Sequence, residues 1–412
     1  MTPVYFARFQ VGRIDATPVG PTFAYDSRWL ATAGAFPMSL SIPLRDGTFG
    51  PDVLVPWLMN LLPEDPALRT VGRNLGVSPQ DVLGLLDHMG RDVAGALSLG
   101  EPRPHETEFR TIDGAADLER IINDLPRKPF LAGDDGVSMS LAGAQDKLPV
   151  AKTPDGLAIP LNGTPSTHIL KPDTEHLPGS VQNEALCLTL ARLCGLDAAS
   201  VTTGRAGARS YLLVDRFDRK TDDNGTVRLH QEDFCQALSK PPAAKYESNQ
   251  SGLAGPTLAD MFRLVDRHMT AADAVALLDA VIFNILVCNT DAHAKNHALL
   301  LSHGSPRLAP LYDVMCAAAW DGITANLSQA VGGKNRGDHI HGRHWKRQAA
   351  ACGLNETRVV ARVAELVGKV DKALPESVAT VEAMPAGGHV LLPRFRDAIA
   401  VRCARVSRNL DD

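Results

Sequence analysis

The first hundred residues carry short segments with either strand-like or helix-like spacing of apolar positions. Polar and apolar positions alternate over residues 37–44, which predicts a strand. Ser78, Pro79 and Asp81 stand where a helix cap, a first-turn proline and an acidic third residue are expected, and apolar side chains follow at helical spacing. The pattern predicts a small α+β unit, residues 1–105.

Short apolar runs dominate the next part of the chain, residues 106–230. Runs at 148–151, 167–170 and 211–214 are separated by turn-forming residues and predict strands. One helical pattern interrupts them over residues 181–194 and ends before a glycine that is typical of a helix C-cap. Several strands with a single helix predict a small mixed lobe.

Helical spacing prevails over the remaining part, residues 231–412. Thr270 and Asp273 form a capping pattern, and the apolar positions that follow, through residue 286, cover most of the circumference of a helix. Because a helix that is apolar on all sides is buried, we expect this helix at the centre of a helical lobe.

Composition and charge are ordinary for a globular protein, with 44% apolar residues, 22% charged residues and a net charge of −5. A negative net charge argues against non-specific nucleic-acid binding by the whole surface. The seven cysteines form no CxxC pair, so we expect buried thiols in a reducing compartment. No signal-peptide pattern is visible, and the most apolar stretch, residues 274–288, is too short to span a bilayer. We therefore expect a cytoplasmic protein without membrane contact.

The segment 288–296, CNTDAHAKN, directly follows the predicted central helix. Its Asp291 and Asn296 are separated by four residues, the spacing of a protein-kinase catalytic loop. In such a loop the carboxylate accepts the proton of a substrate hydroxyl, and the amide oxygen binds magnesium, a hard cation. A predicted hairpin, residues 297–312, then delivers Asp313 as a second metal ligand. The residues around Asp313 are Tyr-Asp-Val rather than Asp-Phe-Gly.

Two charged residues precede this segment in the order that a kinase site requires. Lys171 ends a predicted strand, as does the kinase lysine that binds the α- and β-phosphates, and Glu184 on the next helix is its expected partner. Residues 138–147 would cover the phosphates, although they contain one glycine instead of three. The order predicts an α+β, two-lobed, protein-kinase-like fold with a small N-terminal accessory subdomain and a mostly helical C-terminal lobe. ATP and Mg²⁺ are the expected cofactors.

Each of these residues has a plainer interpretation when it is taken alone. Asp291 and Asn296 are common turn caps after a helix, and Lys171 is an ordinary solvated strand end. Asp291, His293 and His297 also have the residue types of a zinc-dependent hydrolase. A third alternative is a catalytically silent, kinase-shaped binding partner in a repressor complex.

The same motifs, with several others, resemble the HipA family of bacterial serine/threonine kinase toxins. The family's patterns match at residues 140–147, 167–171, 183–184, 216–219, 231–233, 245–247, 290–296 and 312–313. The N-terminal third resembles the family's accessory subdomain at residues 36–44, 60–63 and 90–97. The resemblance covers about residues 10–320 and implies a HipA-like fold.

The resemblance also implies a role for individual residues. Asp291 would be the catalytic base, with His293 beside it, and Asn296 and Asp313 would bind magnesium. Ser140 matches the serine that such kinases autophosphorylate, which ejects the loop and inactivates the enzyme. The supporting residues would be Glu184 and Lys295, and the ATP-binding residues Ser140, Leu141, Ala142, Gly143, Ala144, Gln145, Lys147, Lys171, Asp215, Phe217 and Gln231.

Partners are implied by the resemblance alone. Family members are toxins paired with a helix-turn-helix antitoxin, HipB, and the pair binds operator DNA, so we expect DNA contact here mainly through an antitoxin. Characterised members phosphorylate aminoacyl-tRNA synthetases, which implies a protein substrate in translation. The basic stretch 334–347, which also holds three histidines, predicts a solvated or partner-binding surface.

Overall fold

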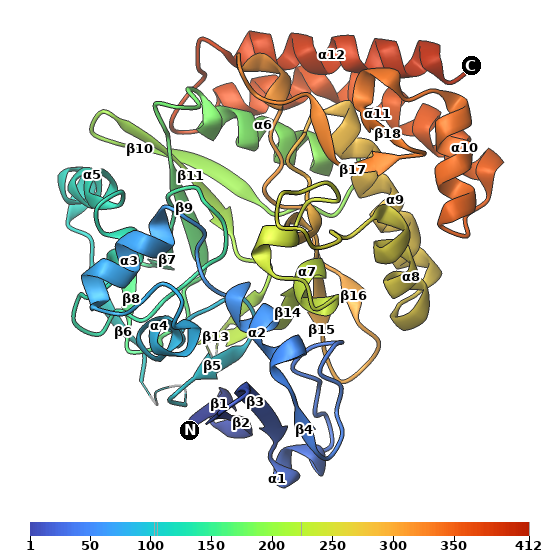
Figure 1. Cartoon of the computed structure of the whole chain (residues 1–412). Helices are drawn as coiled ribbons and strands as arrows, with labels where there is room; N and C mark the ends of the chain where they lie inside the picture. Colours follow the sequence, from blue (N-terminus) through green and yellow to red (C-terminus); the bar gives the residue numbers. More distant parts are fainter. Residues whose placement is uncertain (103, 105, 224, 412) are drawn as a thin grey trace.

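The computed structural model describes residues 1–102, 104, 106–223 and 225–411. Its N-terminal part is an antiparallel sheet in the order β4-β3-β2-β1-β5, at the opposite end of the molecule from the C-terminus (Figure 1). The strands are β1 (Thr2–Phe6), β2 (Phe9–Thr17), β3 (Gly20–Tyr25), β4 (Thr48–Phe49) and β5 (Leu97–Leu99). The helices are α1 (Ser27–Leu30), α2 (Pro51–Met59), α3 (Ala67–Leu75) and α4 (Val82–Met89).

Two local predictions for this part are wrong. Residues 37–44 form a loop with one β-bridge, Ser39 to Ile42, instead of a strand. The Tyr25 hydroxyl accepts from the Met38 amide at 2.8 Å and donates to the Ile42 carbonyl, so a tertiary contact sets the conformation. Helix α4 is capped by Asp81, which accepts from Gly84 N at 2.9 Å, and not by Ser78.

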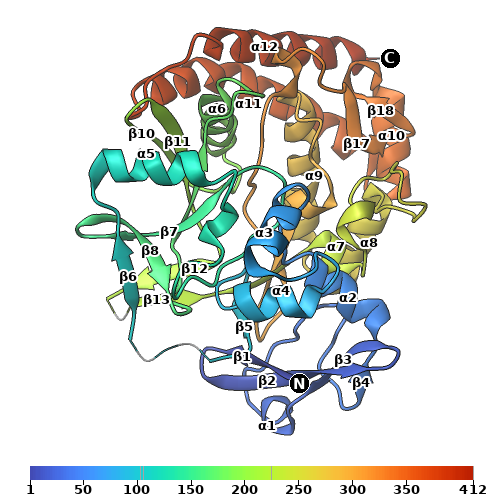
Figure 2. The same cartoon turned by 60° about the vertical axis from the view of Figure 1, so that its left-hand side comes forward.

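The second part is a six-stranded antiparallel sheet in the order β10-β11-β9-β7-β8-β6. Its bounds are β6 (Glu108–Thr111), β7 (Leu148–Thr153), β8 (Gly156–Leu161), β9 (His168–Pro172), β10 (Val201–Ala206) and β11 (Arg209–Asp215). Helix α6 (Ser180–Leu193) packs against β10 and β11, and α5 (Gly114–Asp124) against β10, as Figure 2 shows. The predicted strands β7, β9 and β11 and helix α6 are confirmed, whereas the sequence pattern missed β6, β8 and β10. A hairpin, β12 (Arg219–Asp222) and β13 (Gly225–Arg228), follows.

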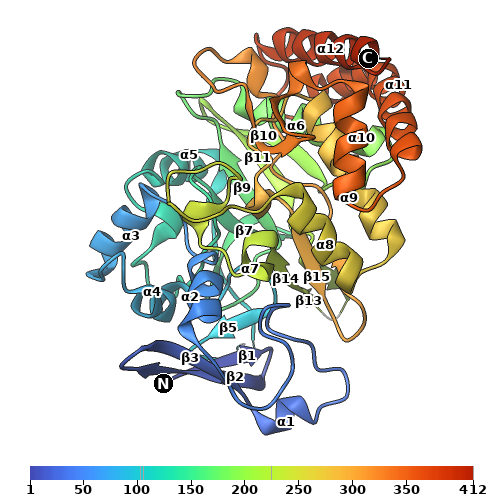
Figure 3. The same cartoon turned by 45° about the vertical axis from the view of Figure 1, so that its right-hand side comes forward.

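The third part is mostly helical, as predicted. It contains α7 (Phe234–Ala237), α8 (Leu258–His268), α9 (Ala271–Leu286), α10 (Gly342–Ala351), α11 (Glu356–Glu382) and α12 (Leu392–Asn409). A small sheet, β14 (His230–Asp233), β15 (Ala298–Leu301) and β16 (Arg307–Leu308), lies beside the predicted catalytic segment, residues 288–296. Strand β17 (Asn326–Val331) pairs with β18 (Lys334–Arg336). Figure 3 shows α11 and α12 on the outside of this part, far from the N-terminal sheet.

Helix α9 is the centre of the helical part. Thr270 and Asp273 form the predicted reciprocal capping box, and the helix is buried from Leu277 to Leu286. It packs against α8, α11 and α12, and with α6 these helices form one apolar cluster. A second apolar cluster joins the N-terminal sheet to the six-stranded sheet, through residues such as Ile14, Trp57 and Leu170. The N-terminal part is therefore packed onto the sheet lobe.

The structure leaves some expectations open. The boundaries at residues 105 and 230 stay a prediction. The predicted linker 101–109 includes residues 103 and 105, which lie outside the described residues. Within the described ranges, no helix is long and apolar enough to cross a membrane.

Candidate active site

A cavity of about 620 Å³ lies between the six-stranded sheet and the helical part, within the size range of small-molecule sites. Every predicted site residue lines it except Ser140. From the sheet lobe come Leu141, Ala142, Gly143, Ala144, Gln145, Lys147, Lys171, Glu184, Asp215 and Phe217, and from the helical part Gln231, Asp291, His293, Lys295, Asn296 and Asp313. Residues far apart in the chain thus converge on one space.

Lys171, on β9, links the two lobes. Its Nζ lies 2.7 Å from Glu184 Oε1 on α6 and 2.7 Å from Asp313 Oδ1, which follows the hairpin of β15 and β16. Burial alone would raise the pKa of Asp313, but the ion pair with Lys171 holds it well below its usual range. Asp313 is therefore an anion, and its φ of +57° is held although residues other than glycine rarely adopt this conformation.

Side-chain amides fasten the predicted catalytic loop to the buried helix α9. Asn289 Nδ2 donates to Asn284 Oδ1 on α9 at 2.8 Å, and Asn289 Oδ1 accepts from the Asp291 amide at 3.0 Å. Asn296 Nδ2 donates to the Asp291 carbonyl at 2.8 Å. Because its nitrogen is used within the loop, Asn296 has its amide oxygen to offer to a cation in the cavity.

Asp291 stands at the mouth of the cavity with its side chain partly exposed. Loss of solvation raises its pKa, and the Tyr246 hydroxyl, which donates to Asp291 Oδ1 at 2.6 Å, opposes that rise. His293 Nε2 is 4.0 Å from the same oxygen, and its ring packs edge-on against Tyr246. Burial lowers the pKa of His293 to about 3, so the imidazole is neutral near pH 7.

The predicted phosphate loop curls around Lys147. Lys147 Nζ donates to the Ala142 carbonyl at 2.5 Å, and burial lowers its pKa to about 8. Gly143 has a φ of +106°, a conformation that residues other than glycine rarely adopt, so this position favours glycine. Ser140, near the start of this loop, is fully buried, and its Oγ donates to the Leu61 carbonyl at 2.7 Å. It does not line the cavity where ATP binding was predicted.

The resemblance implies that Asp215 and Phe217 line a hinge that binds adenine largely through backbone atoms, and this segment lies at the end of β11. The amides of Asp215 and Arg216 donate to the carbonyls of Ser200 and Thr167, at 2.9 and 3.0 Å, so both hold the hinge in place. The predicted backbone contacts with adenine would then use carbonyl oxygens or the Phe217 amide. The ring of Phe217 lies 5.4 Å from that of Tyr312, which closes one wall of the cavity.

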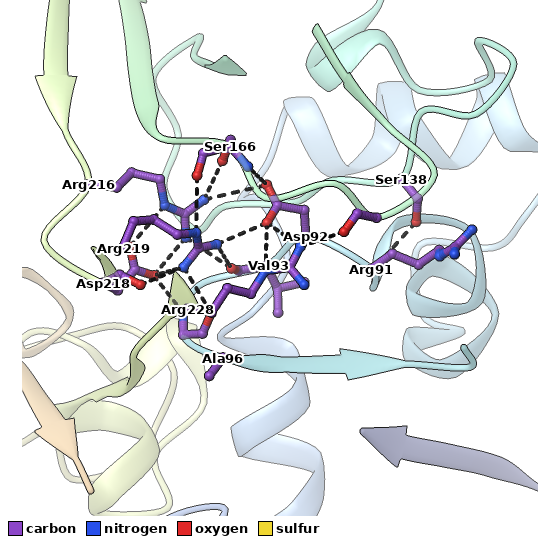
Figure 4. Close-up of polar contacts among 12 residues, drawn as sticks. Arg91, Asp92, Val93, Ala96, Ser138, Ser166, Arg216, Asp218, Arg219 and Arg228 are labelled. Atoms are coloured by element: carbon purple, nitrogen blue, oxygen red, sulfur yellow. Dashed lines mark hydrogen bonds and ion pairs between the residues drawn. The ribbon is translucent and has the colours of Figure 1, made fainter. Parts of the chain in front are cut away.

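A buried cluster of three arginines and two aspartates supports the hinge from behind (Figure 4). Asp92 Oδ1 lies 2.9 Å from Arg219 and 2.8 Å from Arg228, and Arg216 pairs with Asp218 at 2.7 Å. Gln231 Nε2 donates to Asp218 Oδ2 at 3.1 Å. Burial alone would raise the pKa of Asp92, but the arginines hold it well below its usual range. Because Asp92 follows α4, the cluster joins the N-terminal part to the hinge.

Several residues of the site were missed by sequence analysis. Glu64, Lys245, Asp233 and Tyr312 also line the cavity, and the Tyr246 hydroxyl bonds Asp291. Motif matches at residues 60–63, 231–233, 245–247 and 312–313 include or adjoin all five, but sequence analysis assigned none of them a role. The motif matches could therefore have pointed to these residues. The contacts between the motifs are long-range.

The zinc alternative finds no support in the geometry. His293 lines the large cavity, whereas His297 lines a separate small cavity and hydrogen-bonds the backbone of Ala292. Across the residues that the structure covers, no group of three or more His, Cys, Asp or Glu side chains is arranged to hold a metal ion.

The donor set fits the expected ATP and magnesium. An anionic Asp313 carboxylate and the Asn296 amide oxygen are hard ligands of the kind that magnesium prefers. Lys171 and Lys147 place two ammonium groups in the same cavity, suited to phosphates, and Ile169, Val214 and Phe217 line it with apolar surface suited to a base.

A sheet lobe and a helical lobe around such a cavity define a two-lobed, kinase-like fold, as predicted. Models of the HipA N-terminal domain and the HipA-like C-terminal domain match residues 2–100 and 139–374. The chain belongs to the HipA family.

Relatives agree with this assignment. "Putative kinase Y4mE" of Sinorhizobium fredii is 39% identical over 362 residues, which cover 85% of each chain. "Serine/threonine-protein kinase toxin HipA" of Shewanella oneidensis is 26% identical over 424 residues, 99% of this chain and 96% of the relative. The solved complex of Shewanella oneidensis MR-1 HipA, HipB and operator DNA contains a chain with a TM-score of 0.88 at 24% identity, covering 100% of this chain and 98% of that one. This last likeness shows the fold.

Proposed function

We propose that this chain is an ATP-dependent serine/threonine protein kinase. The observation that carries the proposal is Lys171, which bonds Glu184 and Asp313 in the cavity that Asp291 and Asn296 also line. This arrangement has the parts of a phosphoryl-transfer site: a cation for the phosphates, an aspartate and an amide for magnesium, and a carboxylate for the hydroxyl. Relatives named as kinases support the same conclusion.

In the proposed reaction Asp291 accepts a hydrogen bond from a substrate serine or threonine hydroxyl and takes its proton during transfer. Its raised pKa makes it a better proton acceptor than an ordinary surface aspartate. Lys171 anchors the phosphates, and Asn296 and Asp313 hold magnesium, which neutralises phosphate charge when bound. The neutral His293 and the Tyr246 hydroxyl keep Asp291 in place.

The test is phosphotransfer from labelled ATP with magnesium by the full chain and by Asp291→Asn. We expect the variant to bind ATP normally and to lose at least ~10²-fold in phosphotransfer, the range for loss of a general base. Asp321→Asn is the matched control, since this exposed aspartate lies outside the cavity. Near-normal transfer by Asp291→Asn would refute the assignment, and no transfer by the unmodified chain would favour the silent binding partner.

Ser140 is proposed as an autophosphorylation site that controls the loop. Its hydroxyl is buried against Leu61, so a phosphate there, with a charge of about −1.5 to −2, cannot stay in place and should expel the loop. Ser140→Ala should abolish self-labelling while transfer to other proteins continues. Self-labelling at another residue in this variant would contradict the proposal.

We also propose that the kinase is the toxin of a cytoplasmic toxin–antitoxin pair, with a HipB-like antitoxin that contacts operator DNA and a translation component, such as an aminoacyl-tRNA synthetase, as substrate. Support comes from the relative described as a kinase toxin and from the similar chain solved with HipB and operator DNA. A phosphoproteome of cells that express the chain, compared with Asp291→Asn, tests the substrate. Absence of any active-site-dependent phosphoprotein in translation would exclude it.

A further inference from the structure

The loop that follows α2 in the N-terminal part lies directly on the phosphate loop. The Leu61 carbonyl accepts from Ser140 Oγ at 2.7 Å, and the Glu64 amide donates to the Gly143 carbonyl at 3.2 Å. Pro63 forms a parallel β-bridge with Gly143. The N-terminal part therefore touches the nucleotide side of the cavity through backbone as well as side-chain contacts.

The Glu64 carboxylate reaches further, to the catalytic side. Its Oε2 lies 2.6 Å from Lys245 Nζ and its Oε1 3.1 Å from Lys295 Nζ, so each oxygen takes one ammonium group. All three side chains line the cavity. Burial alone would raise the pKa of Glu64, but the two lysines lower it to about 2, so the carboxylate is charged over the working pH range.

Both lysines belong to the segments that hold the catalytic base. Lys245 precedes Tyr246, whose hydroxyl donates to Asp291, and the Lys245 carbonyl accepts from the Ala294 amide at 3.2 Å. Lys295 precedes Asn296, and its carbonyl accepts from the Tyr312 hydroxyl at 2.6 Å. Without Glu64, the ammonium group of Lys245, which acts electrostatically on Asp291, would lack its carboxylate partner and would favour an ion pair with Asp291.

We propose that Glu64 is a positioning residue for phosphotransfer: it holds Lys245 and Lys295 and balances their charge, so that Asp291 remains a competent base. The N-terminal part then completes the kinase site rather than merely packing beside it. The inference rests on the proposed kinase activity.

The experiment compares the full-length chain with Glu64→Gln, with Asp65→Asn as the control. Asp65 is the next residue, but its exposed side chain pairs with Arg69 on the surface. Loss of charged hydrogen bonds of this kind corresponds to an expected fall in kcat of about 10- to 100-fold. The KM for ATP should not rise, since the cavity becomes more positive. Asp65→Asn should keep the kcat of the unmodified chain.

A double variant separates positioning from simple support of the fold. Combining Glu64→Gln with Lys245→Gln removes one uncompensated charge and should restore part of kcat. A loss of structural support alone would lower the unfolding temperature and make the double variant worse.

The outcomes are distinct. Absence of phosphotransfer by the unmodified chain would overturn the proposed function itself. With an active unmodified chain, a Glu64→Gln variant with unchanged kcat would overturn only the role of Glu64. A fall in kcat with no recovery in the double variant would overturn that role as well.

Discussion

Replacement of Lys171 by methionine tests the ion pairs that link the sheet lobe to the helical lobe. Methionine keeps much of the side-chain volume but removes the ammonium group that lies 2.7 Å from both Glu184 and Asp313. Both carboxylates then lose their cation, and Glu184 is almost completely buried. The variant therefore changes charge at the centre of the cavity without opening a large void.

The size of the effect follows from these contacts. Breaking a buried ion pair by removing one partner costs about 3–5 kcal/mol of stability. The loss of stability should be smaller at low pH, because Glu184, whose pKa is raised by burial, takes up a proton in place of the missing cation. ATP binding loses charge-assisted hydrogen bonds of about 1.5–3 kcal/mol, so Kd should rise roughly 10- to 150-fold.

The assay is calorimetric titration with ATP and magnesium, combined with thermal unfolding at two pH values. Lys152→Met is the control, because Lys152 is exposed on β7 in the same sheet. We expect the control to behave as the unmodified chain does. An unchanged Kd for ATP in Lys171→Met would refute the role of this lysine, and an unchanged unfolding temperature would refute the buried-pair argument.

Three further predictions concern buried and half-buried groups outside the cavity lining. Burial raises the pKa of Glu232 to about 8, from 4.5 in the unfolded chain, so the folded form holds an extra proton between these pH values. The free energy of unfolding should therefore fall as the pH rises from 4.5 to 8. Glu232→Gln should flatten this decline in urea unfolding, and a pH dependence parallel to that of the unmodified chain would contradict the prediction. Asp92→Asn leaves the buried Arg228 without its carboxylate partner, while Arg216 and Arg219 keep Asp218. It should lower the free energy of unfolding by about 3–5 kcal/mol, against less than about 1 kcal/mol for the exposed Asp65→Asn. Tyr246→Phe removes a hydrogen bond that lowers the pKa of Asp291, so the acidic side of the pH profile of kcat/KM should move to higher pH. An unchanged pH profile would show that the Tyr246 hydroxyl does not act on Asp291.

Local patterns predicted the elements that carry the site. The capping residues Thr270 and Asp273 located α9, and a buried α9 places the segment from Asp291 to Asn296 directly beside the core. Likewise the strand that ends at Lys171 and the helix with Glu184 are adjacent in sequence, so their contact follows from a short connection. These short-range relations are visible in sequence order.

Tertiary contacts explain what sequence analysis missed. Glu64 lies 181 and 231 positions from its two lysines, and no periodicity indicates such a pairing. The alternation over residues 37–44 looked like a strand, but Tyr25 and the carboxyl group of Glu232, which accepts from Leu40 N at 2.8 Å, hold this segment as a loop. Ser140 was expected in the ATP site, yet the contact with Leu61 buries it behind the loop.

The most direct test of the central claim is a crystal structure of the chain with magnesium and a non-hydrolysable ATP analogue. The account predicts phosphate oxygens on Lys171 Nζ, a metal ion bound by Asn296 Oδ1 and Asp313, and Asp291 facing the γ-phosphate. A nucleotide bound elsewhere, or a Lys171 turned away from the phosphates, would contradict it.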